Sequence, residues 1–475
     1  MIKKIGLILG PLSFIFINCL SFENIEEKAS IVIALASWMI IWWISEAVSI
    51  SVTSLLPLVI FPFFEVMEIN QVGANYGSSI VFLFFGGFVL ALALEKVNLH
   101  KRIALTIINK TGTSPNRVIL GFMIATAFMS MWISNTASTV VMLPIALSVI
   151  NLLIDNKKGF SKSEKNFSLS VMLGIAFSAN SGGIATVIGT PPNSVLIGLL
   201  ENEYNIEISF LNWMVIGLPF SITLLTIIYF LLTRVLFRNE SIKFKSSSTL
   251  IKNKLNELGK LSKNEKHVLI IFGITVFLWI FRTVINQLIP GFKLSDTIIS
   301  VGCAISLFAI PSKFSKPEFI LNWNDTKNLA WGILILFGGG LALAKGMSET
   351  GIVSLITDTI SGANLNILLT VSLLIAMMLF MTELMSNVAL VAVLAPVMAG
   401  IAIGLEIPIL HLLIPITIAS SCAFMLPMAT PPNAIVFASG YVKVSEMVRA
   451  GILINILSIL LLILMYKFFI PLIFN

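Results

Sequence analysis

The chain has 475 residues, of which 57% are hydrophobic and only 11% are charged, and its formal net charge is +7. Because a soluble globular domain carries about 25% charged residues, this composition excludes a soluble enzyme. Apolar runs of about 20 residues recur along the chain, and each is long enough to cross a bilayer as a helix. The sequence therefore predicts an all-α polytopic membrane protein whose basic residues lie in loops on one side of the membrane, not on nucleic acid.

The N-terminal segment starts with Lys3 and Lys4 and continues as an apolar run to Leu20. It resembles a signal peptide, but no cleavage site of the A-x-A type follows it, and many more apolar runs do. We therefore predict that residues 1–28 form a retained first span whose N-terminus lies in the cytoplasm.

Lysine and arginine concentrate in a few later segments, which the positive-inside rule places in the cytoplasm. One of them, residues 99–115, is expected as a short basic cytoplasmic segment. Spans that alternate between the two sides fall near 29–46, 48–64, 80–98, 167–200 and 213–236 in the first half, and near 267–290, 296–312, 331–348, 409–440 and 445–470 in the second. The prediction is about 11 transmembrane helices in the cell (inner) membrane, with the C-terminus outside.

Two further apolar stretches enter and leave on the same side, so we predict that they form re-entrant helical hairpins. The first, 116–154, has basic flanks and faces the cytoplasm, whereas the second, 366–404, has acidic or neutral flanks and faces outward. A polar linker, 238–266, is expected to be a cytoplasmic connection between a first repeat, 29–237, and a second repeat, 267–475.

Three sequence pieces of the first half recur in the same order in the second. Phe85-Gly86-Gly87 returns as Phe337-Gly338-Gly339, Ser134-Asn135-Thr136 as Ser386-Asn387-Val388, and Thr190-Pro191-Pro192-Asn193 as Thr430-Pro431-Pro432-Asn433. The offset is 252 residues from Gly86 to Gly338 and from Ser134 to Ser386, and 240 residues from Thr190 to Thr430. Since the hairpins open to opposite sides, the halves are predicted to be inverted-topology repeats, the plan of secondary transporters whose sites lie at the repeat interface.

The proline pairs mark breaks in the predicted helices, because successive prolines remove backbone donors and clash with the preceding turn. Irregular backbone at membrane depth is tolerated only where it is buried in protein or lines a cavity. Freed carbonyls with Asn, Ser and Thr oxygens suit a small hard cation, whereas half-helix N-termini suit an anion. Neither motif contains a charged residue, so co-bound Na+ is the expected source of positive charge for a buried anion.

The paired motifs resemble the signatures of the divalent anion/sodium symporter family (INDY-like di- and tricarboxylate carriers), and the resemblance covers both halves. It implies the same plan of spans and hairpins, a homodimer and an elevator-type mechanism. By this resemblance, one sodium ion would be held by Ser130, Ser134 and Asn135 with the backbone near Gly189, and a second by Thr382, the Met385 backbone and Asn387 with the backbone near Ala429. The substrate carboxylates would meet Asn135, Thr136, Asn387 and Val388, with Pro431 nearby.

The function implied is sodium-coupled symport of dicarboxylates of the succinate, malate and fumarate class. Val388 stands where many bacterial members have Thr, and the missing hydroxyl removes a hydrogen bond to an anion that is worth about 1.5–3 kcal/mol. Citrate or sulfate as the substrate and sodium-independent dicarboxylate exchange therefore stay open. A membrane-embedded enzyme would need a cluster of nucleophile, base or metal ligands, and the scattered cysteines and histidines form none.

Features outside the motifs carry three further expectations. Glu383 precedes the second Ser-Asn motif and is either a proton site or a structural hydrogen-bond partner, and we favour the second. Arg282, in the span near 267–290, is interpreted as a snorkelling interface residue rather than as a partner in an ion pair. Trp38, Trp42 and Trp43 are expected in an interfacial belt or at a dimer face.

Overall fold

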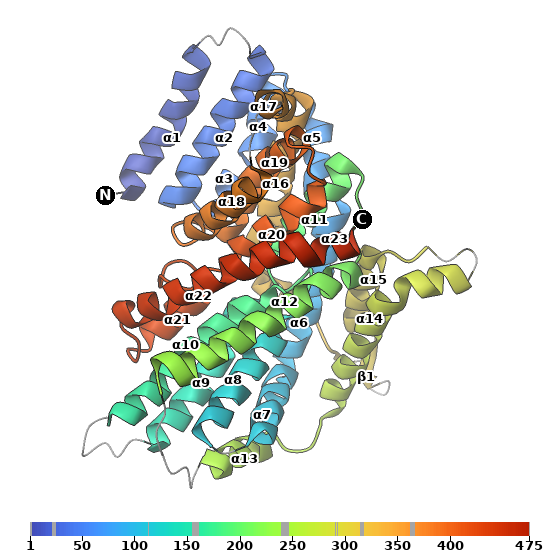
Figure 1. The fold of residues 1–475 in the computed structure, drawn as a ribbon. Coiled ribbons are helices and arrows are strands. Elements are labelled where there is room, and N and C mark those ends of the chain that lie inside the picture. Colours follow the sequence, from blue (N-terminus) through green and yellow to red (C-terminus); the bar gives the residue numbers. More distant parts are fainter. Residues whose placement is uncertain are drawn as a thin grey trace.

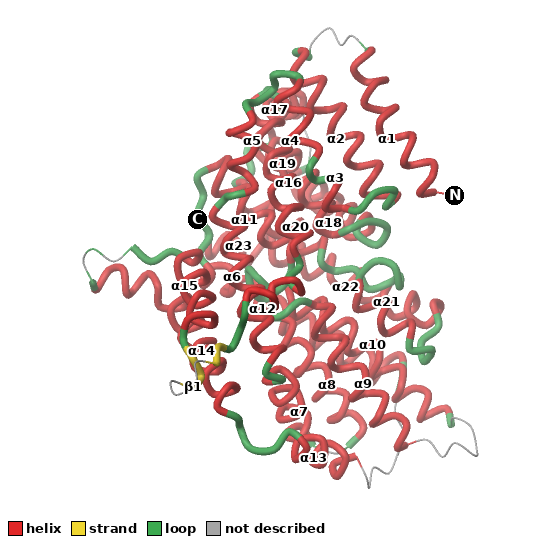
Figure 2. The backbone as a smooth tube through the Cα atoms, turned by 180° about the vertical axis from the view of Figure 1, so that it is seen from behind, coloured by secondary structure: helices red, strands yellow, loops and turns green. Residues whose placement is uncertain are grey.

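The computed structural model describes residues 2–20, 25–112, 114–153, 161–238, 247–289, 291, 293–313, 318–361 and 366–474. Helices dominate this part of the chain. Its one sheet consists of two short antiparallel strands, β1 (Pro311–Lys313) and β2 (Glu318–Phe319). The all-α prediction is therefore confirmed, as the backbone in Figure 2 shows.

The first half of the chain contributes twelve α-helices: α1 (Ile2–Cys19), α2 (Glu27–Ser45), α3 (Ile50–Thr53), α4 (Leu56–Phe63), α5 (Ile69–Tyr76), α6 (Ser79–Lys96), α7 (Leu99–Thr111), α8 (Pro115–Ser130), α9 (Asn135–Leu153), α10 (Lys162–Gly183), α11 (Pro191–Tyr204) and α12 (Phe210–Phe230). The second half contributes α13 (Ser247–Glu257), α14 (Lys263–Leu288), α15 (Asp296–Ala309), α16 (Trp331–Glu349), α17 (Ile352–Ile360), α18 (Ile367–Met381), α19 (Asn387–Gly404), α20 (Ile409–Ser420), α21 (Pro431–Ala438), α22 (Val444–Leu464) and α23 (Ile470–Ile473). Short π-helical segments follow α12 (Leu231–Leu236) and α22 (Met465–Phe469), and a 3-10 helix spans Trp323–Asn328.

Among the described residues, seven helical stretches are long and apolar enough to cross a membrane: Glu27–Ser45, Ile69–Lys96, Phe210–Leu236, Lys263–Leu288, Trp331–Glu349, Asn387–Gly404 and Val444–Ile473. Five shorter apolar helices accompany them. The seven long stretches are fewer than the spans predicted from the sequence, so the number of crossings and the two hairpins stay predictions.

Three predicted spans, 48–64, 167–200 and 409–440, are each broken into two helices. The second helix of each pair carries proline in its first turn, at Pro57 in α4, in α11 and in α21. Proline is tolerated in this position because the first turn of a helix lacks intrahelical acceptors for its N–H groups. The breaks before α11 and α21 fall at the proline pairs, as predicted, whereas the break before α4 was not predicted.

Two polar or basic segments contain helices that were not predicted. The basic segment 99–115 forms α7, which buries Ala104, Leu105 and Ile108 and packs against α8. The linker 238–266, expected as a solvated loop, contains α13, which buries Ile251, while its residues 239–246 and the end of the first hairpin at 154 lie outside the described residues. The apolar side chains that these helices bury explain why they form despite their polar composition.

The N-terminal helix α1 lies beside α2 at one end of the molecule, far from the α7–α10 group (Figure 1). A Cβ atom at Gly10 would lie 2.6 Å from the indole rings of Trp38 and Trp42, so glycine is required for the close approach of α1. Trp43 is buried and donates a hydrogen bond to the Ile50 carbonyl at 3.2 Å. Of the three tryptophans, only Trp43 is fully buried, whereas Trp38 and Trp42 are half-buried against α1, so an interfacial belt or a dimer face stays a prediction.

Arg282 in α14 forms ion pairs, so its interpretation as a snorkelling residue was wrong. Its guanidinium lies 2.9 Å from the Glu207 carboxylate and 3.4 Å from the Asp296 carboxylate, and only 11% of the Arg282 side chain is exposed. Asp296 also accepts a hydrogen bond from the Phe210 backbone N–H at 2.7 Å. The partners of Arg282 could not be identified from the sequence because they lie in the α11–α12 loop and at the start of α15.

Candidate functional site

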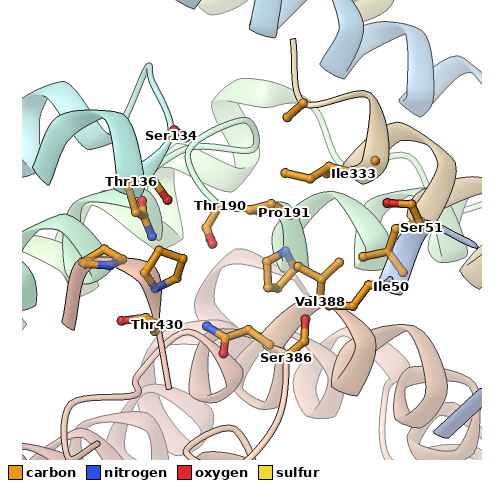
Figure 3. A pocket seen from close by; sticks show the side chains of 18 of the residues that line it. Ile50, Ser51, Ser134, Thr136, Thr190, Pro191, Ile333, Ser386, Val388 and Thr430 are labelled. Atoms are coloured by element: carbon orange, nitrogen blue, oxygen red, sulfur yellow. The ribbon is translucent and has the colours of Figure 1, made fainter. Parts of the chain in front are cut away.

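The repeated motifs from both halves meet at one cavity of about 960 Å³. The motif residues that line it are Ser134, Asn135, Thr136, Thr190, Pro191, Pro192, Ser386, Asn387, Val388, Thr430, Pro431 and Pro432. Figure 3 shows Thr136 and Thr430 on one side of this cavity and Val388 on the other, with Thr190 and Pro191 between them. The helices pack crosswise, because α21 of the second half contacts α9 and α11 of the first half contacts α19.

In the first half, a hydroxyl, an amide and two loop carbonyls form a cluster of oxygen atoms. Ser130 Oγ donates to the Ala179 carbonyl at 2.7 Å, and the end of the Asn135 amide labelled Oδ1 lies 2.5 Å from the same hydroxyl. The same end of the Asn135 amide lies 3.1 Å from the Ala179 oxygen and 3.3 Å from the Gly189 oxygen. The amide nitrogen would satisfy these oxygens by donating to them, whereas the amide oxygen completes a ligand set of the type that hard cations prefer.

The second half repeats this arrangement with equivalent residues. Thr382 Oγ1 donates to the Ser420 carbonyl at 2.6 Å and also lies 2.6 Å from Asn387 Oδ1. Met385 and Ala429, which the family resemblance assigns to the second sodium site, line the same cavity as Asn387. The structure therefore brings together every site residue predicted for this half.

The asparagines that follow the proline pairs hold the broken segments in place. Asn193 donates its side-chain N–H groups to the carbonyls of Gly183, Ile184 and Thr186 at 3.4, 3.4 and 2.8 Å. Asn433 donates likewise to two carbonyls of its own half, those of Ala423 at 3.2 Å and Leu426 at 3.1 Å. Because both amides are fully buried, they satisfy carbonyls that a continuous helix would otherwise have satisfied.

Four helices, α9, α11, α19 and α21, begin at the cavity. Helix N-termini present unpaired N–H groups and a partial positive charge, so they favour anions. Thr136 and Val388 are the second residues of α9 and α19, which places one hydroxyl and one isopropyl group at equivalent positions. Ser134 caps α9 by accepting the Ala137 N–H at 3.1 Å, a role that the sequence did not predict.

Three charged residues at the edge of the cavity were not predicted from the sequence. Lys3, Glu46 and Glu95 line it, and Lys3 pairs with Glu46 at 3.2 Å with both side chains about two-thirds exposed. Lys3 and Glu46 lie far from the repeated motifs in the chain, and no local pattern marks Glu95 as a cavity residue. No group of three or more His, Cys, Asp or Glu side chains that could hold a metal ion occurs in the described ranges.

Glu383 accepts four hydrogen bonds while only 3% exposed. Its carboxylate receives the backbone N–H groups of Phe424, Met425 and Leu426 at 2.8, 2.9 and 3.1 Å, and the Asn455 amide at 2.7 Å. The prediction that Glu383 makes structural hydrogen bonds is confirmed. It holds the break between α20 and α21 through backbone N–H groups, whereas Asn433 holds the same break through backbone carbonyls.

Asn180, in α10, is a further polar residue at the cavity that the sequence analysis missed. It is 1% exposed and bonds to residues of the second half. The signal available was the run Ser178-Ala179-Asn180-Ser181 inside an otherwise apolar span, but nothing in the sequence identifies its partners.

Solved structures of two transporters are similar to this chain in fold. The YdaH transporter of Alcanivorax borkumensis has a TM-score of 0.58 at 9% identity and covers 87% of this chain and 88% of its own. MtrF of Neisseria gonorrhoeae has a TM-score of 0.50 at 13% identity, with 83% of each chain covered. At such low identity the likeness concerns the fold alone.

Other relatives are much more similar to this chain in sequence. The sodium-dependent dicarboxylate transporter SdcS of Staphylococcus saprophyticus is 41% identical over 476 residues, covering 99% of this chain and 92% of that protein. SdcS of Staphylococcus aureus (strain USA300) is 40% identical over 478 residues, with the same shares covered. A family model described as the sodium:sulfate symporter transmembrane region matches residues 8–474. These relatives are transporters and not enzymes, and the chain is a multi-pass membrane protein that belongs to the sodium:sulfate symporter family, as its paired motifs predicted.

Proposed function

We propose that the protein carries small dicarboxylates across the cell membrane together with Na+. The observation that supports this most strongly is the meeting of both Ser-Asn motifs and both Thr-Pro-Pro motifs at one cavity. Four helix N-termini attract an anion there, and clusters of neutral oxygens suit small cations. The relatives named as sodium-dependent dicarboxylate transporters support the same pair of substrates.

Sodium supplies positive charge that the cavity wall lacks. One ion is held by Ser130, Ser134 and Asn135 with the Gly189 backbone, and the other by Thr382, Asn387 and the backbones of Met385 and Ala429. Lys3 is the one basic residue described at the cavity, and Glu46 already pairs with it. A dianion at this depth without sodium would leave buried charge uncompensated, which costs several kcal/mol per ion. This cost is the physical reason why transport of the anion is coupled to transport of Na+.

The substrate carboxylates bind at the starts of α9 and α19, close to Asn135, Thr136, Asn387 and Val388, with Pro431 nearby. A dicarboxylate of the succinate, malate or fumarate type offers one carboxylate to each half. A cavity of about 960 Å³ also accommodates citrate, so a substrate panel with citrate and sulfate decides the class.

Transport in this proposal follows an elevator mechanism in a homodimer. The two inverted repeats, 29–237 and 267–475, contribute one hairpin each, and the hairpins face opposite sides of the membrane as re-entrant elements. The N-terminus is cytoplasmic and the C-terminus lies outside. The matched hydrogen bonds of Ser130 and Thr382 support the equivalence of the two halves.

Uptake of radiolabelled succinate into proteoliposomes tests the proposal, with external Na+ replaced by K+ or choline at constant ionic strength. The proposal predicts that uptake falls to the level of protein-free liposomes without Na+. Uptake that persists in K+ and accelerates when the vesicles contain unlabelled succinate would indicate sodium-independent exchange and refute symport. Channel-sized currents would refute alternating access.

A further inference from the structure

We propose that Asn180 is a positioning residue that couples the two half-sites of the cavity, which are the proposed sodium sites around Asn135 and around Asn387. Sodium binding at one half-site then orders the residues of the other. This inference rests on the proposed function, because it concerns how the two sodium sites of that function communicate. It assigns a role to a residue that belongs to neither repeated motif.

The Asn180 side chain reaches from the first half of the chain into the second. Its Nδ2 atom donates to the Ala423 carbonyl at 3.1 Å and to Thr430 Oγ1 at 3.0 Å. Both acceptors lie on the broken segment between α20 and α21, and Thr430 directly follows Ala429 of the second sodium site. One turn earlier on α10, the ring of Phe177 packs against Phe424 of the same segment, with ring centroids 5.3 Å apart.

The Asn180 backbone belongs to the first half-site. The residue before it, Ala179, provides the carbonyl that accepts Ser130 Oγ at 2.7 Å and lies 3.1 Å from the Asn135 amide. A cation that draws in the Ala179 oxygen therefore also fixes the start of the Asn180 side chain. Asn180 thus has its main chain in one half-site and its hydrogen-bonding end in the other.

No second side chain duplicates this connection. Among the residues that the structure describes, the two hydrogen bonds of Asn180 are the only side-chain hydrogen bonds that join α10 to the broken segment between α20 and α21. Asn193 and Asn433 bond within their own halves. The bridge is therefore carried by one amide.

The residue that stands beside the second half-site as Asn180 stands beside the first makes no such bond. Ser421 follows the carbonyl of Ser420 that accepts Thr382 Oγ1, just as Asn180 follows the carbonyl of Ala179 that accepts Ser130 Oγ. Its hydroxyl is buried and has no hydrogen-bond partner within the described part of the chain. The connection is thus one-sided, and Ser421 offers a control at matched depth.

Coupling through Asn180 has a measurable form. When two binding events are coupled, each changes the affinity of the other by the same factor, and this factor is typically about 5–150-fold. If the two sodium ions fill together, uptake at limiting succinate rises steeply with sodium concentration. Without the hydrogen bonds of Asn180, each half-site must be ordered separately. The curve of uptake against sodium concentration then becomes shallower, and its midpoint moves to a higher sodium concentration.

The test is the sodium dependence of succinate uptake by the full chain in proteoliposomes, for wild type, Asn180→Ala, Asn180→Leu and Ser421→Ala. Leucine keeps the volume of asparagine but removes the donors, so it separates the lost hydrogen bonds from a cavity. Both Asn180 variants are expected to lower the Hill slope and raise half-saturating sodium at least about fivefold. Uptake at saturating sodium should stay within about twofold of wild type, and Ser421→Ala should match wild type throughout.

Three results would overturn the inference. Asn180 variants that lose uptake equally at all sodium concentrations, with an unchanged Hill slope, would show a structural role only. If the Ser421→Ala variant shifts the sodium dependence of uptake as far as the Asn180 variants do, the effect comes from destabilising the broken segments in general and not from the Asn180 bonds. A wild type without sodium dependence would refute the proposed function itself and the coupling with it, whereas the first two results leave the proposed function standing.

Discussion

The asparagines Asn135 and Asn387 occupy equivalent environments, each bonded to a hydroxyl residue five positions earlier. In the proposed function each contributes to a sodium site and to a carboxylate site at once. Replacement of either by alanine removes the oxygen ligand from one half and leaves Ser130 or Thr382 without that partner. Such residues are therefore the most sensitive single positions of the cavity.

We expect Asn135→Ala and Asn387→Ala each to abolish sodium-driven succinate uptake while the protein still inserts and elutes as a single species. Asn286→Ala is the matched control, because Asn286 holds the Leu294 backbone outside the cavity at 2.9 and 3.0 Å. Uptake is measured per amount of reconstituted protein. Wild-type uptake in either cavity variant would remove that residue from the site.

Val388 and Thr136 form a second residue pair, equivalent in position but not in chemistry. Val388→Thr adds a hydroxyl that can donate to a carboxylate, a bond worth about 1.5–3 kcal/mol when the partner is charged. The KM for succinate at saturating sodium should therefore fall about tenfold or more. Thr136→Val is the reciprocal variant and should raise the KM. An unchanged KM in both variants would place the carboxylates elsewhere in the cavity.

At the scale of elements, the contact between α1 and α2 depends on a residue without a side chain. Gly10→Leu would force a side chain into the rings of Trp38 and Trp42, and such overpacking costs about 1–3 kcal/mol. The thermal unfolding midpoint in detergent should fall. Gly273→Leu on α14 is the control, because a Cβ there meets nothing within 4 Å. Equal midpoints for the two variants would mean that α1 does not pack on α2 as described.

The ion pairs of Arg282 connect the α11–α12 loop to α14 and α15. Arg282→Ala leaves the Asp296 carboxylate without its cation, and removal of one partner from a buried pair costs about 3–5 kcal/mol. Lys3→Ala is a matched control, because its pair with Glu46 is exposed and such pairs contribute about 0–1 kcal/mol. Differential scanning fluorimetry should therefore show a clear loss of stability only for Arg282→Ala. A loss as large for Lys3→Ala would contradict the assigned burial.

Features set by local chemistry were predictable at this scale. Pro191 and Pro431 mark the broken helices because proline acts on its own backbone and on the turn before it. The Ser-Asn motifs were recognised as repeated polar sites within apolar stretches, but their position at the starts of α9 and α19 was not predicted. Polar segments were harder, since α7 and α13 form by burying an apolar stripe against neighbours that the local sequence does not reveal.

At the scale of the whole molecule, long-range pairings were beyond the sequence. Asn180 and Thr430 are 250 residues apart, and no local pattern distinguishes this amide from Ser178 or Ser181 beside it. Tertiary packing likewise determines that Lys3 lies at the cavity edge and that Arg282 pairs with Glu207 and Asp296. The chemical class of the cavity was nevertheless predictable, because two copies of an uncharged motif implied neutral oxygen ligands and helix N-termini.

The meeting of the two halves at one cavity makes a single claim central, namely that bound sodium provides the positive charge for the substrate. Isothermal titration of purified protein with succinate, in NaCl and in KCl of equal ionic strength, tests it without any gradient. The account predicts binding in NaCl and an affinity at least about tenfold weaker in KCl. Equal affinities in the two salts would contradict it.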